Sequence, residues 1–215
     1  MKNELLHIDC MEYMKTCEDK QFNLAIVDPP YGIDFARTHT GKGWTVRPSK
    51  SWDKEAPTPA YFEELMRVSK NQIIWGANYF QLPPSQGWVF WDKRQRTFSL
   101  ADGELAWTSF DKALRVFDYS RAEALQEGKI HPTQKPVALY KWLLSHYAHA
   151  GDSLLDTHSG SGSFRIAAYD MGFDLVSCEL DADYCHANEA RYQAHIAQQE
   201  LIPVQEIQQL TFGEK

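Results

Sequence analysis

A carboxylate, two prolines and an aromatic ring occupy four consecutive positions, Asp28-Pro29-Pro30-Tyr31. They follow the apolar run 23–27, which predicts a buried strand that the two prolines must end. In open α/β sheets, ligands bind beyond the carboxyl ends of the strands. There, Asp28 and the carbonyl of Pro29 can accept hydrogen bonds from an exocyclic amine of a base, which frees the nitrogen lone pair and stabilises its developing positive charge. Tyr31 offers a ring for stacking, so the segment suits methylation of such an amine.

A Gly-rich turn, residues 156–163, reads Asp-Thr-His-Ser-Gly-Ser-Gly-Ser between a predicted strand and a predicted helix. Glycines let a ligand approach the backbone, and the helix start supplies unpaired N–H groups. Glu179 stands 17 residues after Gly162 at the end of the next strand, where an acid binds a ribose hydroxyl. Arg165 replaces the third glycine of the dinucleotide fingerprint. A cofactor with one nucleoside and no pyrophosphate, such as S-adenosylmethionine, therefore suits the turn better than NAD.

The elements that must position these residues alternate between short apolar runs and helical patterns, which is typical of α/β proteins. At 215 residues the chain suits a single catalytic domain, 1–215. We expect a Rossmann-like, mostly parallel twisted sheet with helices on both faces and an antiparallel pair at one edge. The expected strands cover 5–8, 23–27, 71–75, 88–91, 104–107, 114–117, 153–156 and 173–178, and the expected helices 10–17, 58–69, 136–148, 163–171 and 181–199. Residues 119–134 read as a polar loop.

Charge is distributed unevenly along the chain. The net charge is −7, but residues 151–215 carry −8 and residues 1–150 carry +1. Within the first part, the stretch 35–60 carries +3, and local patches rather than total charge set attraction to phosphate. The loop 33–57 lacks periodicity, and a loop of this length in a domain is functional or disordered. We expect it to contact a nucleic acid or to be mobile.

Cysteine spacing and apolar patterning exclude other classes of protein. Cys10, Cys17, Cys178 and Cys185 form no Cys-x-x-Cys pair, so we expect free thiols and no metal site. No apolar run reaches the roughly 18 residues of a membrane span, and no apolar signal-peptide core follows Met1. We therefore expect an intracellular, cytoplasmic protein of prokaryotic or phage type that does not bind a membrane.

The Asp-Pro-Pro-Tyr motif comes before the Gly-rich turn along the chain. With the two motifs in this order, the sequence resembles the β class of the S-adenosylmethionine-dependent amino-methyltransferases of DNA. His131-Pro132-Thr133-Gln134-Lys135-Pro136 is similar to that family's His-Pro-Thr-x-Lys-Pro segment, which lines the methionine end of the cofactor. Asp9 matches the acid placed against the adenine amino group, and Lys135 is a sensible partner for the cofactor's carboxylate. The resemblance implies these cofactor-binding residues: Asp9, His131, Thr133, Lys135, Pro136, Asp156, His158, Gly160, Ser161, Gly162, Ser163 and Glu179.

The resemblance also indicates the acceptor. Family members with Asp at the position of Asp28 tend to methylate the 6-amino group of adenine, whereas those with Ser methylate the 4-amino group of cytosine. We therefore expect adenine in DNA, with Asp28, Pro29, Pro30 and Tyr31 as the catalytic residues. Cytosine in DNA, a base in RNA, and a non-catalytic module that only binds the cofactor stay open as alternatives. The sequence departs from the family at Thr157-His158, where Pro-Phe is usual. Two interpretations of His158 stay open, a ring that stacks on the cofactor in place of the Phe and a polar turn residue.

Double-stranded DNA is the partner that this chemistry implies, with the target base flipped out of the helix. We expect phosphate contacts from the loop and from the basic run after the strand 88–91, and base contacts from the segment after Trp75. The candidate residues are Arg37, Lys42, Arg47, Lys50, Lys93, Arg94 and Arg96 for phosphates and Asn78 and Tyr79 for the base. No separate target-recognition domain fits before His131, so we expect short or relaxed site specificity. A homodimer and a cognate restriction nuclease stay open.

Overall fold

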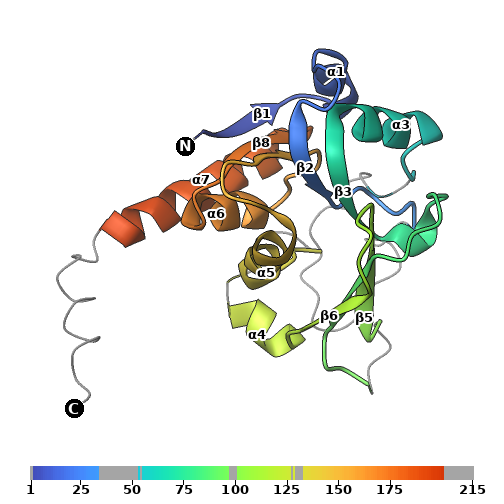
Figure 1. Cartoon of the computed structure of the whole chain (residues 1–215). Coiled ribbons are helices and arrows are strands. Elements are labelled where there is room, and N and C mark those ends of the chain that lie inside the picture. The colour runs from blue at the N-terminus through green and yellow to red at the C-terminus, as the bar shows by residue number, and fades with distance from the viewer. Residues whose placement is uncertain are drawn as a thin grey trace.

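A computed structural model describes residues 2–33, 53, 55–96, 101–126, 128 and 133–200 (Figure 1). The strands are β1 (Asn3–His7), β2 (Phe22–Val27), β3 (Ser69–Trp75), β4 (Trp88–Asp92), β5 (Gly103–Thr108), β6 (Arg115–Asp118), β7 (Ser153–Asp156) and β8 (Asp174–Glu179). The helices are α1 (Cys10–Lys15), α3 (Pro59–Val68), the 3₁₀ turn η2 (Ala77–Tyr79), α4 (Arg121–Gln126), α5 (Val137–Tyr147), α6 (Ser163–Asp170) and α7 (Ala182–Glu200).

The strands form one eight-stranded sheet in the order β1-β8-β7-β2-β3-β5-β4-β6. Strands β1, β8, β7, β2 and β3 are parallel, and β5 alone runs antiparallel to both of its neighbours. The antiparallel pairing expected at one edge is thus made by β5, third from that edge, whereas the edge strand β6 runs parallel to β4. This mixed α/β sheet confirms the expected fold class.

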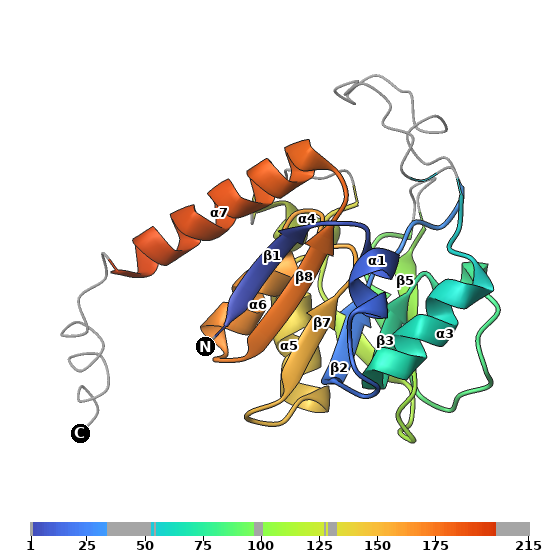
Figure 2. The ribbon, with the colours of Figure 1, turned by 90° about the horizontal axis from the view of Figure 1, so that it is seen from above.

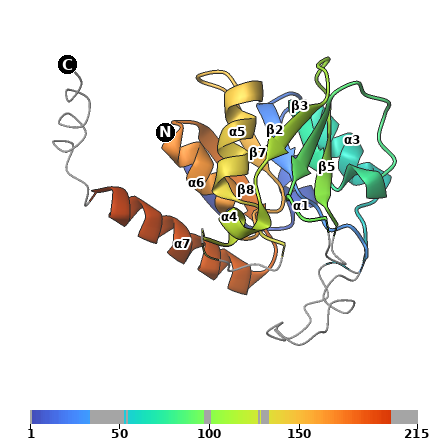
Figure 3. The ribbon, with the colours of Figure 1, turned by 90° about the horizontal axis from the view of Figure 1, so that it is seen from below.

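The central strands are apolar on both faces because helices cover both. Helices α5 and α6 pack on one face, and α1 and α3 pack on the other (Figures 2 and 3). In β2, Leu24 and Ile26 belong to the first core while Ala25 and Val27 belong to the second, as the period of two in a strand requires. Both faces of the sheet are therefore covered where β2 and β7 lie side by side.

One expected loop contains a helix. Residues 119–134 read as a loop, but α4 (Arg121–Gln126) forms inside it, so that part of the prediction is wrong. A capping box explains the helix, because the backbone N–H and hydroxyl of Ser120 both donate to Glu123 Oε2, and the Glu123 N–H donates back to Ser120 Oγ. Among the described residues, no helix combines the length and the apolar character needed to cross a membrane.

Candidate active site

Two prolines end β2 and turn the chain so that Asp28 and Tyr31 lie at the carboxyl end of that strand. A buried carboxylate holds the turn in place. Asp53 is 5% exposed, and its Oδ1 accepts hydrogen bonds from the backbone N–H groups of Tyr31, at 2.7 Å, and Gly32, at 3.1 Å. Asp53 was not among the expected site residues, because nothing in the local sequence pairs it with a turn 22 residues earlier.

Both oxygens of the Asp28 carboxylate are engaged. The Tyr31 hydroxyl donates to Oδ1 at 2.6 Å, and Lys135 Nζ lies 2.5 Å from Oδ2. Lys135 is only 3% exposed, and its ammonium also donates to the Tyr31 hydroxyl at 3.2 Å and pairs with Glu104 Oε2 at 3.0 Å. The structure thus places Lys135 between two carboxylates, and Glu104 of β5 joins the site without having been predicted.

These buried charges shift one another's pKa values. Burial raises the pKa of Asp28, and Lys135 opposes that effect. Burial alone would lower the pKa of Lys135, but Asp28 and Glu104 outweigh it and raise the pKa. Glu104 is half-buried, yet Lys135 and Lys93 hold its pKa at about 2. At neutral pH the cluster therefore contains a charged lysine whose two carboxylate partners differ in basicity, Asp28 being the more basic.

The Tyr31 ring is confined on several sides. It stacks on Tyr79, with ring centroids 5.1 Å apart and planes inclined by 15°, and it meets Phe80 edge-on. Gly76, with φ +71°, comes so close that an added Cβ would lie 2.1 Å from Cε1 of Tyr31. Only glycine tolerates both this φ and this contact, so the Trp75–Tyr79 segment sets where the Tyr31 ring can lie.

The Gly-rich turn follows β7, the strand beside β2. Glu179 at the end of β8 accepts a hydrogen bond from the Gly160 N–H at 2.8 Å. From α7, Asn188 Nδ2 donates to Ser159 Oγ and to the Gly160 carbonyl, and a Cβ on Gly162 would lie 2.3 Å from Asn188 Oδ1. Asn188 is fully buried and is a second residue that the sequence did not reveal. It fixes the turn from a distant helix.

Asp156 and His158 are buried in the same turn. Burial raises the pKa of Asp156 to about 8, and the carboxylate accepts a hydrogen bond from the His158 N–H at 3.1 Å. Burial lowers the pKa of His158 to about 4, so the imidazole is neutral at pH 7. Tyr61 of α3 completes a chain in which its hydroxyl lies 2.6 Å from Thr157 Oγ1, itself 2.9 Å from His158 Nδ1.

The remaining candidate cofactor residues fall into three groups. Asp9 follows β1 and caps α1, accepting hydrogen bonds from Met11 N–H and Glu12 N–H. Ser161 and Ser163 are tied to Arg191 of α7. Thr133 and Pro136 precede α5, whereas His131 lies outside the described residues. Asp156 and Glu179 thus end the neighbouring strands β7 and β8, and Asp9 follows β1 by two residues, so the fold brings all three acids to one edge of the sheet.

The candidate DNA-contacting residues differ in exposure and in whether other side chains of the protein already pair with them. Asn78 and Tyr79 are exposed in η2 beside Tyr31. Lys93 pairs with Glu104, both half-buried, Arg94 pairs with Asp118 and Glu123, and Arg96 pairs with Asp92 through two hydrogen bonds. Arg37, Lys42, Arg47 and Lys50 lie outside the described residues. Lys93 is accordingly a poor candidate for phosphate contact, and the other residues stay predictions.

Arg165, at the position of the missing third glycine, is 2% exposed. Its guanidinium donates to Asn3 Oδ1 and Asn188 Oδ1, and it stacks on the Tyr192 ring at 4.1 Å. The arginine therefore joins β1, α6 and α7 where a dinucleotide-binding turn would need close helix–strand packing.

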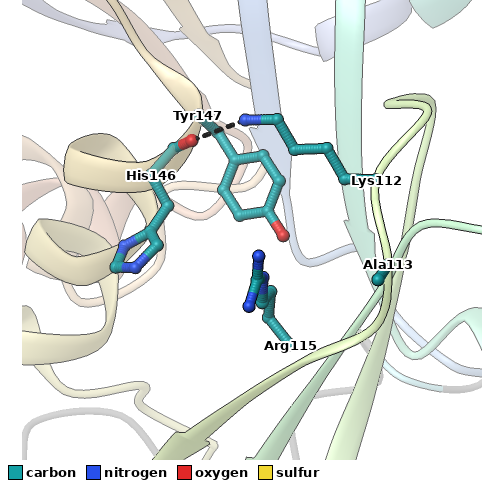
Figure 4. Close-up of a pocket in the computed structure, with 5 residues that line it drawn as sticks. All are labelled: Lys112, Ala113, Arg115, His146 and Tyr147. Atoms are coloured by element: carbon teal, nitrogen blue, oxygen red, sulfur yellow. Dashed lines mark hydrogen bonds between the residues drawn. The ribbon is translucent and has the colours of Figure 1, made fainter.

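A separate cavity of about 270 Å³ lies at the far end of α5 (Figure 4). Its lining residues are Lys112, Ala113, Arg115, His146 and Tyr147. Lys112 Nζ donates to the His146 carbonyl at 2.8 Å. In the described part of the chain, none of these residues bonds to Asp28, Lys135 or the Gly-rich turn, so the cavity is distinct from the candidate site.

Comparison with known proteins agrees with this geometry. The type II methyltransferase M1.MboII of Moraxella bovis is 21% identical over an alignment of 261 residues. The alignment covers 88% of this chain and 95% of that protein. The crystal structure of the M1.HpyAVI–SAM complex matches with a TM-score of 0.59 and 18% identity, covering 87% of this chain and 98% of that one. The PvuII DNA methyltransferase, cytosine-N4-specific, matches with a TM-score of 0.60 and 12% identity, covering 89% and 86%. The family model described as DNA methylase matches residues 83–190, half of the chain, and the protein therefore belongs to the N6/N4 DNA methyltransferase family.

Proposed function

We propose that this protein transfers a methyl group from S-adenosylmethionine to the 6-amino group of adenine in DNA. The observation that carries the proposal is the placement of Asp28 and Tyr31 at the end of β2, directly beside the Gly-rich turn that follows β7. An amine held by the first motif would therefore face a cofactor held by the second. The Asp at position 28 favours adenine over cytosine as the acceptor.

The donor set of the turn fits this cofactor. Asp9, Asp156 and Glu179 supply carboxyl groups that suit ribose hydroxyls, an amino group and the cationic amino-acid part of the molecule. The neutral His158 suits contact with an uncharged purine. When bound, S-adenosylmethionine supplies an electrophilic methyl group on a sulfonium sulfur. Asp9, Asp156, His158, Gly160 and Glu179 would hold it.

Asp28 has two tasks in the transfer. With the Pro29 carbonyl it accepts hydrogen bonds from the amine protons, so that the nitrogen lone pair points at the methyl carbon. Asp28 would then take the proton that the nitrogen loses once it carries the methyl group. Since Lys135 and the Tyr31 hydroxyl now occupy the two oxygens of Asp28, we expect the amine to replace the neutral hydroxyl rather than the ammonium.

Tyr31 and Tyr79 would receive the flipped base. Tyr79 is 48% exposed and covers Tyr31, so its ring can turn aside at little cost and leave a face on which the base stacks. No metal ion and no covalent enzyme–base intermediate takes part in this scheme. The proton that leaves the methylated nitrogen stays on Asp28.

The deciding experiment identifies the methylated nucleoside. Purified protein is incubated with labelled S-adenosylmethionine and unmodified double-stranded DNA, and the DNA is digested to nucleosides for mass spectrometry. N6-methyladenine is the expected product. Methylated cytosine would overturn the adenine assignment and support the second candidate, cytosine N4 methylation, which the structural match to the cytosine-N4-specific PvuII enzyme favours. Label in RNA alone, or cofactor binding without transfer, would overturn the proposal.

Gly76→Ala tests the position of the Tyr31 ring. The added Cβ cannot fit 2.1 Å from Tyr31 Cε1, so the ring must move, and we expect kcat to fall by about 10- to 100-fold. Gly172→Ala is the matched control, since Gly172 has a similar φ of +77° with nothing within 4 Å of the added carbon. Equal activity of the two variants in a methyl-transfer assay would show that the ring position does not limit the reaction.

Asp156→Asn separates stability from binding. The folded pKa of Asp156, about 8, exceeds its ordinary value of 3.8, so the native state binds the extra proton and stability falls as pH rises between these values. Asparagine removes that charge, and we expect the free energy of unfolding at pH 8 to rise by about 1 kcal/mol. At pH 8, where the Asp156 carboxyl is about half ionised, affinity for S-adenosylmethionine should fall at least about tenfold because asparagine cannot supply an ionic hydrogen-bond acceptor.

Thermal unfolding at pH 5 and pH 8, with calorimetric titration of the cofactor, measures both effects of Asp156→Asn. Asp152→Asn, just before the same strand, is the control, because Asp152 accepts a hydrogen bond from the His149 N–H in a surface turn. A stability change that is the same at both pH values would contradict a buried, protonated Asp156.

A further inference from the structure

Glu104 is the one acid of the candidate site on the reversed strand β5. Its two carboxylate oxygens pair with different lysines: Oε1 pairs with Lys93, and Oε2 lies 3.0 Å from Lys135 Nζ. Lys135 in turn reaches Asp28 at 2.5 Å. The cluster therefore alternates in charge along Lys93, Glu104, Lys135 and Asp28, and only Asp28 adjoins the Gly-rich turn through the neighbouring strand.

Sharing Lys135 between two carboxylates changes what Asp28 can do. A buried ammonium with a single carboxylate partner forms a tight ion pair, and that carboxylate becomes a weaker hydrogen-bond acceptor and a weaker base. Glu104 takes part of the ammonium's hydrogen-bonding capacity and adds negative charge near Asp28. The Asp28 carboxylate is thereby left with more basicity than a simple pair with Lys135 would allow.

We propose that Glu104 is a positioning residue for methyl transfer, which holds Lys135 between two carboxylates and so keeps Asp28 able to accept the protons of the target amine. The inference rests on the proposed function of Asp28 and deepens it. Glu104 touches neither the amine nor the cofactor in this scheme and acts through Lys135. The geometry also explains why Lys93, which follows β4, points inward to Glu104.

The ionisable groups around Asp28 define the expected pH dependence. Lys135, Glu104 and Tyr31 contact Asp28 or its lysine, and Asp156 and Tyr140 are the further groups coupled to it electrostatically. Glu104 is among the charges that raise the pKa of Asp28. Removing its charge and leaving Lys135 to Asp28 alone must lower that pKa. The acidic limb of the pH–kcat profile, set by ionisation of Asp28, should then move to lower pH.

Glu104→Gln tests the inference because it keeps shape and hydrogen-bond capacity while removing the charge. We expect kcat to fall about tenfold, KM for DNA and affinity for S-adenosylmethionine to change less than about twofold, and the acidic limb to shift down by about one pH unit. Glu104→Asp should restore most of the rate. Glu64→Gln is the matched control: Glu64 is 27% exposed against 24% for Glu104, and it too pairs with a cation, Arg67, away from the site.

A second measurement does not need turnover. Carbon-13 NMR of labelled aspartate carboxyls, with Asp28 assigned from an Asp28→Asn sample, follows the titration of Asp28 directly. A lower Asp28 pKa in Glu104→Gln supports the inference even if the wild type methylates another acceptor. An unchanged Asp28 titration, or kinetics equal to those of Glu64→Gln, would overturn it. An inactive wild type would refute the proposed function, while the titration would still decide the role of Glu104.

Discussion

Asp28→Asn should abolish most methyl transfer, with kcat reduced by at least about 10³-fold. Asparagine has the shape of aspartate but cannot take the proton released from the methylated nitrogen, nor stabilise positive charge on it. Its amide N–H₂ would also face Tyr31 or Lys135, which already donate hydrogen bonds at this place. Affinity for S-adenosylmethionine should change less than about threefold, because Asp28 lies on β2 and the proposed cofactor residues lie on β1, β7 and β8.

Transfer of labelled methyl groups to DNA under single-turnover conditions measures the chemical step for Asp28→Asn, and calorimetry measures cofactor binding. Asp19→Asn is the control, because Asp19 pairs with Arg67 on the surface and is 77% exposed. The idea that Asp28 is the proton acceptor would be refuted by an Asp28→Asn enzyme that retains a tenth or more of the wild-type rate.

Lys135→Met should destabilise the protein by about 3–5 kcal/mol at neutral pH, because removing one partner of a buried ion pair leaves uncompensated charge. Methionine keeps much of the length of the side chain but leaves Asp28 without a cation beside Glu104, which keeps only Lys93. The pKa values of both carboxyls must then rise, since like charges disfavour ionisation. Methyl transfer should be lost as well, because a protonated Asp28 cannot accept the amine protons.

The sign of the pH dependence distinguishes this loss of Lys135 from ordinary misfolding. In the wild type, Glu104 has a pKa of about 2 against an ordinary value of 4.5, so its contribution to stability is complete above the ordinary value and is lost as pH falls toward 2. In Lys135→Met the pKa of Asp28, already raised by burial, rises further because Lys135 no longer opposes that effect, so the variant loses stability as pH rises. The difference in free energy of unfolding between wild type and Lys135→Met should therefore be larger at pH 8 than at pH 5.

Urea unfolding at pH 5 and pH 8 measures this difference for Lys135→Met. Lys141→Met serves as control, since Lys141 pairs with Asp170 but is 44% exposed. We expect the control to lose less than about 1 kcal/mol, the usual contribution of an exposed ion pair. A deficit in Lys135→Met that is equally small, or that shrinks at higher pH, would show that the lysine does not neutralise the two carboxylates.

Short-range patterns were sufficient to predict the fold class, the family and the two main motifs. Apolar runs marked all eight strands, most clearly the central ones, because a strand buried on both faces must be apolar throughout, and prolines or glycines marked where β2 and β7 end. Parallel strands bring their carboxyl ends to one edge of a sheet. Asp28, Asp156 and Glu179 could therefore be expected to converge before any coordinate was known.

The residues that complete the site come from contacts between segments far apart in the chain, which no local pattern encodes. Asp53 reaches the turn after β2 across 22 positions, Lys135 reaches the Tyr31 hydroxyl across 104, and Asn188 reaches Gly160 across 28. Glu104 enters only because β5 runs antiparallel between β3 and β4. By itself the sequence determined which strands end in chemically useful residues. Only the packing of the tertiary structure decided which buried charges meet there, and burial in turn sets how strongly those charges shift one another.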